Sequence, residues 1–72
     1  MVISIFYTKI GKSRHYREEH EKKVPWSKVI ELIFTIKNKR RKGNRIEIEN
    51  DKFYLLCKIE DKTLYVINAK RK

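Results

Sequence analysis

The alternation of apolar and polar residues in the second half of the chain is the feature that most constrains its fold. Three segments carry it: RIEIE at 45–49, KFYLLCKIE at 52–60 and TLYVINA at 63–69. Such alternation is typical of β-strands that bury one face. Asn50-Asp51 and Asp61-Lys62 separate the segments, at the places where two-residue hairpin turns are expected. The sequence therefore predicts a three-stranded antiparallel meander.

These two turns set a register for the meander. The predicted facing pairs are Ile48–Phe53, Ile46–Leu55, Ile59–Leu64 and Cys57–Val66. Because side chains alternate across a strand, one face becomes wholly apolar. That face collects Ile46, Ile48, Phe53, Leu55, Cys57, Ile59, Leu64 and Val66. The opposite face mixes charged, tyrosine and aliphatic side chains: Arg45, Glu47, Tyr54, Leu56, Lys58, Tyr65 and Ile67.

The segment from Trp26 to Lys37 has the spacing of an amphipathic helix. Its apolar residues Val29, Leu32, Ile33 and Ile36 recur at i, i+3, i+4 and i+7, and Trp26, Ile30 and Phe34 widen the stripe. Pro25 suits the start of a helix. Such a wide stripe needs a cover, and either the apolar face of the sheet or a second copy of the chain would supply it.

The remaining segments complete an α+β pattern. Residues 2–8 predict a first strand, Gly11-Lys12-Ser13 a turn, and Arg14–Lys23 a short polar helix that Ser13 caps. Residues 38–44 predict a loop in which Gly43 takes a positive φ. We therefore predict one α+β domain over residues 1–69, ordered β-α-α-β-β-β. Its mostly antiparallel four-stranded sheet carries the main helix on one face, and residues 70–72 form a basic tail.

Length and composition exclude several classes of protein. A chain of 72 residues is too short for a dinucleotide-binding fold or an α/β barrel. Its single cysteine, Cys57, permits no internal disulfide and suits a reducing cytoplasm, and on the apolar face it should be an inert packing residue. No apolar run is long enough to span a membrane. The abundance of Lys, Glu and Ile is compatible with a thermophilic source.

Two histidines lie in the polar helix, but the sequence predicts no metal or cofactor. His15 and His20 are five residues apart, and on an α-helix they would point about 140° from each other. They would then not bind one metal as an i, i+4 pair does.

The positive charge points to a polyanionic partner. Nineteen Lys and Arg against nine Asp and Glu give a net charge of +10. Nine of the nineteen cations lie in residues 37–45 and 70–72, where a loop and a tail would be free to contact phosphates. Heat adaptation alone does not explain this excess, because thermophilic surfaces usually balance the two signs.

The predicted partner is nucleic acid, with RNA favoured over duplex DNA because no recognition helix is evident. Tyr54 and Tyr65 on the mixed face would stack on unpaired bases. Alternatively they are ordinary cross-strand pairs, Tyr54 with Glu47 and Tyr65 with Lys58. The full predicted contact set is Lys39, Arg40, Arg41, Lys42, Arg45, Tyr54, Lys58, Tyr65, Lys70, Arg71 and Lys72. A homodimer, or a complex with an acidic protein, is the alternative outside nucleic-acid binding.

The order of elements and the basic surface resemble the RelE/ParE superfamily of small toxins. The matching features are His15 at the start of the first helix, Trp26-Ser27-Lys28-Val29-Ile30 at the start of the second, and Leu64-Tyr65-Val66-Ile67 as the last strand. The resemblance implies an α+β fold and mRNA cleavage by side chains on an open sheet face, here Arg45, Lys58 and Tyr65. Many of these toxins place a functional Tyr or His near the end of the last strand, where this sequence has Ala69-Lys70-Arg71-Lys72. We therefore assign no catalytic residue.

Overall fold

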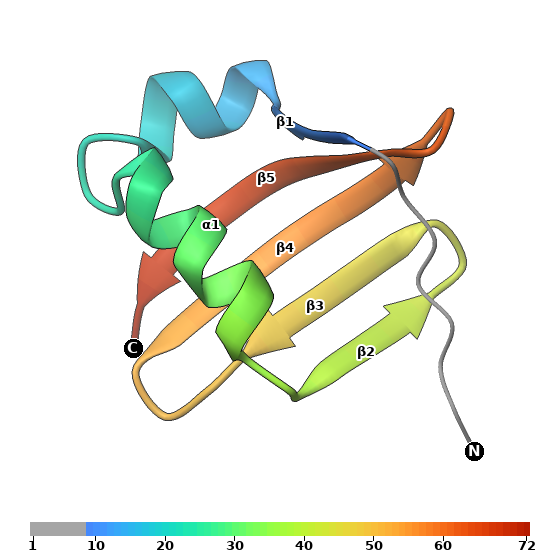
Figure 1. The fold of residues 1–72 in the computed structure, drawn as a ribbon. Helices are drawn as coiled ribbons and strands as arrows, with labels where there is room; N and C mark the ends of the chain where they lie inside the picture. The colour runs from blue at the N-terminus through green and yellow to red at the C-terminus, as the bar shows by residue number, and fades with distance from the viewer. Residues whose placement is uncertain (1–8) are drawn as a thin grey trace.

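A computed structural model describes residues 9–72 and shows an α+β fold with one α-helix and a five-stranded mixed sheet (Figure 1). In chain order the elements are β1 (Lys9–Lys12), the π-helix η1 (Tyr16–His20), α1 (Trp26–Thr35), β2 (Lys39–Lys42), β3 (Arg45–Glu49), β4 (Phe53–Glu60) and β5 (Thr63–Arg71). The strand order is β1-β5-β4-β3-β2. β1 runs parallel to β5, and every other pair is antiparallel. The predicted strand at 2–8 lies outside the described residues.

The four-stranded prediction is wrong at β2, and the turn predicted at Gly11-Lys12-Ser13 is wrong because Gly11 and Lys12 belong to β1. Residues Lys39–Lys42 form an edge strand, not a loop, and pair with β3 across a turn at Gly43-Asn44. Gly43 has a φ of 62°, so a glycine meets the backbone requirement of this turn. The sequence KRRK contains no apolar residue, so it lacks the alternating pattern from which a strand is predicted. β2 forms because its backbone groups pair with those of β3.

The meander forms as predicted, but one hairpin has a different register. Across the second turn Cys57 faces Val66 as expected. Across the first, Ile48 faces Leu55 and not Phe53. Asn50 causes the shift, because its Oδ1 accepts hydrogen bonds from the Lys52 and Phe53 amides at 2.9 and 2.8 Å and widens the turn. A shift of two residues leaves the faces unchanged.

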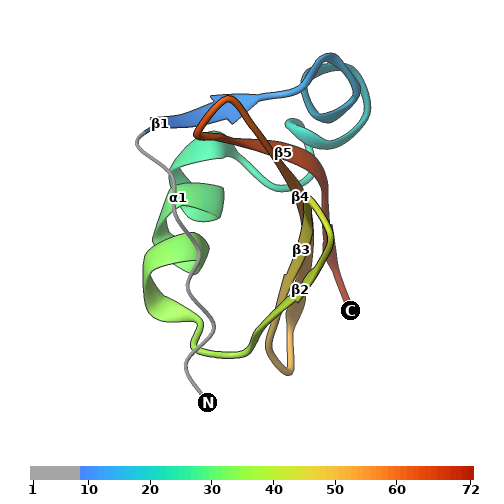
Figure 2. The ribbon, with the colours of Figure 1, turned by 90° about the vertical axis from the view of Figure 1, so that its right-hand side faces the viewer.

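The core lies between α1 and the apolar sheet face. Figure 2 shows α1 on one side of the sheet, and its buried residues are Val29, Leu32 and Ile33. The predicted apolar face is buried except at Ile59, which is partly buried and packs against the core. Phe34 is 70% exposed, so the stripe of α1 is narrower than its sequence suggests.

The polar segment before α1 contains a π-turn. Ser13 caps it as predicted, since the Ser13 Oγ accepts a hydrogen bond from the Tyr16 amide at 3.0 Å. The Glu21 amide then donates to the Tyr16 carbonyl at 2.9 Å, a bond that spans five residues and not four. The prediction that His15 and His20 point apart is therefore wrong: their Nε2 atoms are 3.1 Å from each other.

β5 is longer than predicted and includes part of the expected tail. It continues through Arg71, so Lys70 and Arg71 pair with Tyr54 and Phe53 of β4. The pairing shifts between Leu56 and Cys57, which leaves Ile67 without a facing residue and places Asn68 opposite Leu56. Within the described residues, no helix has the length and apolar character needed to span a membrane.

Candidate nucleic-acid interface

The sheet face opposite α1 is the candidate interface, and we call it the outer face. In Figure 2 it is the side of β2, β3 and β4 that points away from α1, and within residues 9–72 no helix lies over it. Side chains on the outer face therefore project from a hydrogen-bonded sheet toward solvent.

One row of side chains crosses this face from strand to strand. Lys42 faces Arg45, Arg45 faces Lys58, and Lys58 faces Tyr65. Because directly facing residues share a side of the sheet and strands lie about 4.8 Å apart, the row spans roughly 15 Å. We call Lys42, Arg45, Lys58 and Tyr65 the cationic row. It combines three positive charges with one aromatic ring.

Tyr65 ends the row beside a glycine. Gly11 of β1 faces Tyr65, and a Cβ at Gly11 would lie 3.3 Å from two ring carbons of this tyrosine. The missing side chain therefore leaves space for the ring against β1. Tyr65 is 37% exposed, so part of its ring remains open to solvent.

The row has little compensating charge. Within residues 9–72 no carboxylate forms an ion pair with Lys42 or Arg45. Lys58 pairs with Glu60 at 3.1 Å, but both side chains are exposed, and such pairs contribute little. The row is thus available to an anion.

A depression of about 250 Å³ lies next to the row. Its lining residues are Lys42, Arg45, Glu47, Tyr54 and Leu56. An apolar side chain and an aromatic ring thus lie within reach of two cations. This is the combination that a base and its phosphate require.

Two predicted contact residues on the outer face are already engaged within the chain. Arg40 Nη2 lies 2.5 Å from Glu49 Oε1 and 4.0 Å from Glu47 Oε1. The Tyr54 hydroxyl donates to Glu47 Oε2 at 2.7 Å, a diagonal contact between neighbouring strands, because Tyr54 directly faces Glu49 and not Glu47. Burial, followed by this hydrogen bond, raises the pKa of Tyr54 to about 12. Lys70 Nζ also lies 5.4 Å from the centroid of the Tyr54 ring. The ring of Tyr54 is therefore less available than that of Tyr65 for stacking on a base.

Lys39 and Arg41 point to the other side of the sheet. They face Ile48 and Ile46, whose side chains are buried beneath α1. The Lys39 ammonium donates to the Ile36 carbonyl at 2.6 Å, and Arg41 Nε donates to the Gly43 carbonyl at 2.8 Å. The predicted basic loop is therefore divided between two faces.

The three C-terminal cations lie at the far end of the sheet from the cationic row. Tyr65 and Arg71 are six residues apart on β5, which corresponds to about 20 Å. Arg71 Cζ is 5.5 Å from the Phe53 ring centroid, and Lys72 Nζ is 2.9 Å from Glu49 Oε2. This hydrogen bond is the main reason that the pKa of Glu49 is lowered. The predicted loop and tail thus meet at Glu49, which pairs with both Arg40 and Lys72, and the tail lies apart from the cationic row.

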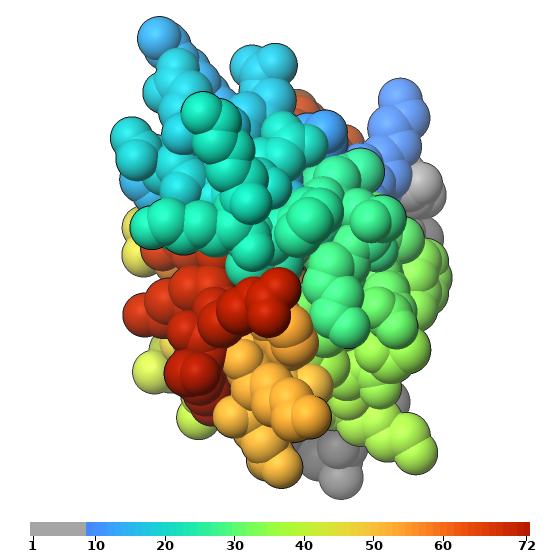
Figure 3. All heavy atoms as spheres, turned by 90° about the vertical axis from the view of Figure 1, so that its left-hand side faces the viewer, coloured from blue at the N-terminus to red at the C-terminus, as the bar shows by residue number. Residues whose placement is uncertain are grey.

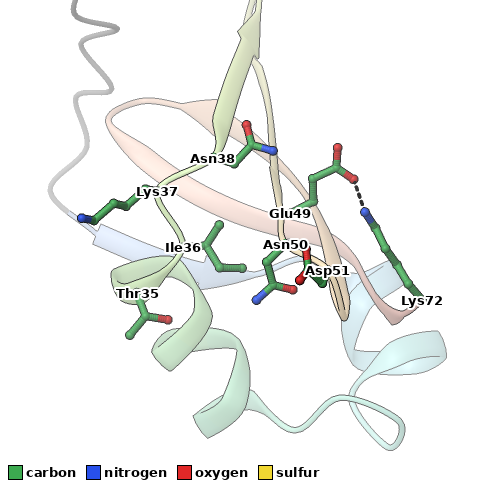
Figure 4. A pocket seen from close by; sticks show the side chains of 8 residues that line it. All are labelled: Thr35, Ile36, Lys37, Asn38, Glu49, Asn50, Asp51 and Lys72. Carbon is green, nitrogen blue, oxygen red and sulfur yellow. Dashed lines mark ion pairs between the residues drawn. The ribbon is translucent and has the colours of Figure 1, made fainter.

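A larger depression of about 510 Å³ lies where α1 ends (Figure 4). Both signs of charge line it, and Figure 4 shows Lys72 turned toward Glu49 while Lys37 points away. Because the opposite charges neutralise each other there, it is a weaker anion site than the cationic row.

The row depends on β2, which the sequence reading missed. The dipeptide Gly43-Asn44 between Lys42 and Arg45 was the available signal, since Gly-Asn is a two-residue hairpin turn.

A scan against protein-family models gives no match, and searches of curated proteins and of solved structures find no similar chain. The resemblance to RelE/ParE toxins therefore stays a prediction.

Proposed function

We propose that this protein binds single-stranded nucleic acid on its outer face, with RNA, free or within a ribosome, as the target. The cationic row is the observation that carries the proposal. It places three cations and one partly exposed aromatic ring side by side on the sheet face that α1 does not cover.

The chemistry of the row matches a single strand better than a duplex. Lys42, Arg45 and Lys58 would neutralise successive phosphates and release counterions. Tyr65 would stack on an unpaired base, which a base-paired duplex does not present. Contacts of this kind position a strand without reading its sequence.

A salt titration tests the electrostatic part. We expect RNA affinity to fall with salt, with a log–log slope of about −2 for three neutralised phosphates. Arg45→Ala should weaken binding and reduce the slope by about 0.7. Lys52→Ala is the matched control, since it removes one exposed cation from the β3–β4 turn at the other end of the sheet. A slope near zero, or equal effects of the two substitutions, contradicts the proposal.

The aromatic part is tested at Tyr65. Tyr65→Ala should lose about 1–3 kcal/mol of stacking, whereas Tyr65→Phe should bind nearly as well. The measurement is fluorescence anisotropy with labelled oligonucleotides, single-stranded and duplex. Preference for the duplex would reject the single-strand assignment.

RNA cleavage is a second candidate, favoured by one juxtaposition. Arg45, Lys58 and Tyr65, which the toxin resemblance marks for such roles, lie in consecutive positions of the row. If the Tyr65 hydroxyl transfers a proton, Tyr65→Phe should retain RNA binding but lose cleavage of ribosome-bound mRNA and growth arrest. Binding by the unmodified protein without cleavage leaves only the binding function.

A complex with an acidic protein, or a homodimer, is the competing outcome. Size-exclusion chromatography with light scattering, before and after nuclease treatment, separates the two. A dimer or protein complex that survives nuclease, together with no RNA affinity at low salt, would replace nucleic acid as the partner.

A further inference from the structure

We propose that His15 and His20 form a two-histidine site for Zn²⁺ or a similar late transition-metal ion. The two Nε2 atoms are 3.1 Å apart, and the ring centroids are 4.9 Å apart at an interplanar angle of 61°. The site is separate from the outer face and does not depend on the proposed function.

The π-turn creates this juxtaposition. On an α-helix residues three or four apart are neighbours, whereas the bond from the Glu21 amide to the Tyr16 carbonyl advances five residues. His15 precedes Tyr16, and His20 ends η1, so the longer turn brings the two rings together edge to face. The π-turn thus places side chains at i and i+5 next to each other, as an α-helix places side chains at i and i+4.

The nitrogen separation suits a shared metal ion. Two imidazole nitrogens bound to tetrahedral Zn²⁺ at about 2.0–2.1 Å are separated by about 3.3 Å. Nitrogens at adjacent corners of a square-planar Cu²⁺ site lie about 2.9 Å apart. The observed 3.1 Å falls between these values, so the separation needs little change, although both rings must turn until their Nε2 lone pairs point at the ion.

The turn that carries the histidines is anchored at both ends. The Ser13 hydroxyl caps its start, and Tyr16 is fully buried with its hydroxyl donating to the Val24 carbonyl at 2.6 Å. Figure 3 shows the segment on the surface, beside the end of β5. His15 is exposed and His20 partly exposed, so an ion can reach them from solvent.

Proton balance is simple. In the metal-free pair one Nε2 donates a hydrogen to the other. On binding, that ring moves its proton from Nε2 to Nδ1, and both Nε2 lone pairs become ligands without net proton release. Within residues 9–72 no cluster of three or more His, Cys, Asp or Glu side chains could hold a metal ion. Water would therefore complete the coordination, as in an exchangeable rather than a structural site.

Calorimetric titration of the untagged protein with Zn²⁺ tests the proposal. We expect one ion per chain, and a loss of about tenfold or more in affinity for either His15→Ala or His20→Ala, because each removes the chelate. Lys22→Ala is the matched control in the same exposed segment. Circular dichroism checks that each variant retains its fold.

Nuclear magnetic resonance gives a second, independent readout. Zn²⁺ should shift the ring signals of both histidines together and drive both to the Nδ1–H tautomer. Unchanged affinity in either single variant, or a shift of only one ring, would overturn the site. So would one ion per two chains together with a dimer in light scattering, since that assigns the metal to a bridge between copies.

Discussion

Tyr16 joins the polar N-terminal segment to the core. Its side chain is fully buried, its ring centroid lies 5.6 Å from that of Trp26, and its hydroxyl donates to the Val24 carbonyl. Burial, with a smaller contribution from Glu21, raises its pKa to about 12. The sequence shows it as the single apolar anchor of residues 14–23, and the structure adds the hydrogen bond that fixes the turn before Pro25.

Tyr16→Phe should destabilise the protein by about 1–2 kcal/mol, because it leaves the Val24 carbonyl without its buried donor. Urea unfolding followed by circular dichroism measures this change. Tyr65→Phe is the control, since the ring of Tyr65 is partly exposed, and it should change stability by less than about 0.5 kcal/mol. Equal losses in the two variants would show that the hydrogen bond to Val24 contributes nothing.

The β4–β5 hairpin carries local strain at the element scale. Asp61 and Lys62 form its two-residue turn with φ values of 50° and 60°. Non-glycine residues adopt this left-handed region at a cost, and Asn-Gly is the preferred pair.

Replacing Asp61-Lys62 with Asn-Gly should therefore stabilise the protein by about 1 kcal/mol. Thermal and urea unfolding check the gain. Lys52→Gly in the β3–β4 turn is the comparison, because Lys52 has no positive φ, and it should be neutral or destabilising. A loss of stability in the Asn-Gly variant would indicate that the native side chains contribute more than the backbone strain costs.

The elements differ in how far their sequences predict them. α1 begins at Trp26 and the meander forms as expected, because burial of one face forces a repeating apolar pattern. β2 has no such pattern, since as an edge strand it depends on backbone pairing to β3. The π-turn adds one residue to a helical turn. The segment is too polar to show this change as a shift in the spacing of apolar residues. The first hairpin register follows from a side-chain acceptor on Asn50 that a count of turn residues misses.

The candidate site was predictable only in part, for the same reason. Arg45, Lys58 and Tyr65 share a face that alternation alone defines. Lys42 joins them only through β2. Lys39, Arg41 and Arg71 were grouped with them by sequence proximity, but the sheet directs these three to its other face, whereas Lys70 lies on the outer face far from the row.

At the scale of the whole molecule, burial of weak acids makes stability depend on alkaline pH. Burial raises the pKa of the Cys57 thiol from its usual 9.0 to about 12, and Tyr16 and Tyr54 rise from 10.0 to about 12. Between the pKa values of the unfolded chain, 9.0 and 10.0, and the raised values near 12, the unfolded chain binds fewer protons than the folded one. These three groups should therefore leave stability unchanged in the neutral range and lower it between about pH 9 and pH 12.

Urea unfolding midpoints from pH 7 to pH 11 measure this dependence. Cys57→Val replaces the thiol with a group that does not ionise, so the variant should lose less stability between pH 9 and pH 10. A pH profile identical to that of the parent would exclude Cys57 as a contributor.

The position of β1 has a consequence for how the protein is made. Among the strands of residues 9–72, β5 alone pairs with β1, and it follows β1 by about fifty residues in the chain. A ribosome translates α1 and the β2–β4 hairpins before it translates β5. Until β5 is made, β1 has no strand of the described sheet to pair with. Assembly of the nascent polypeptide should therefore finish late, and ribosome-stalled chains that stop before Thr63 should leave β1 open to protease.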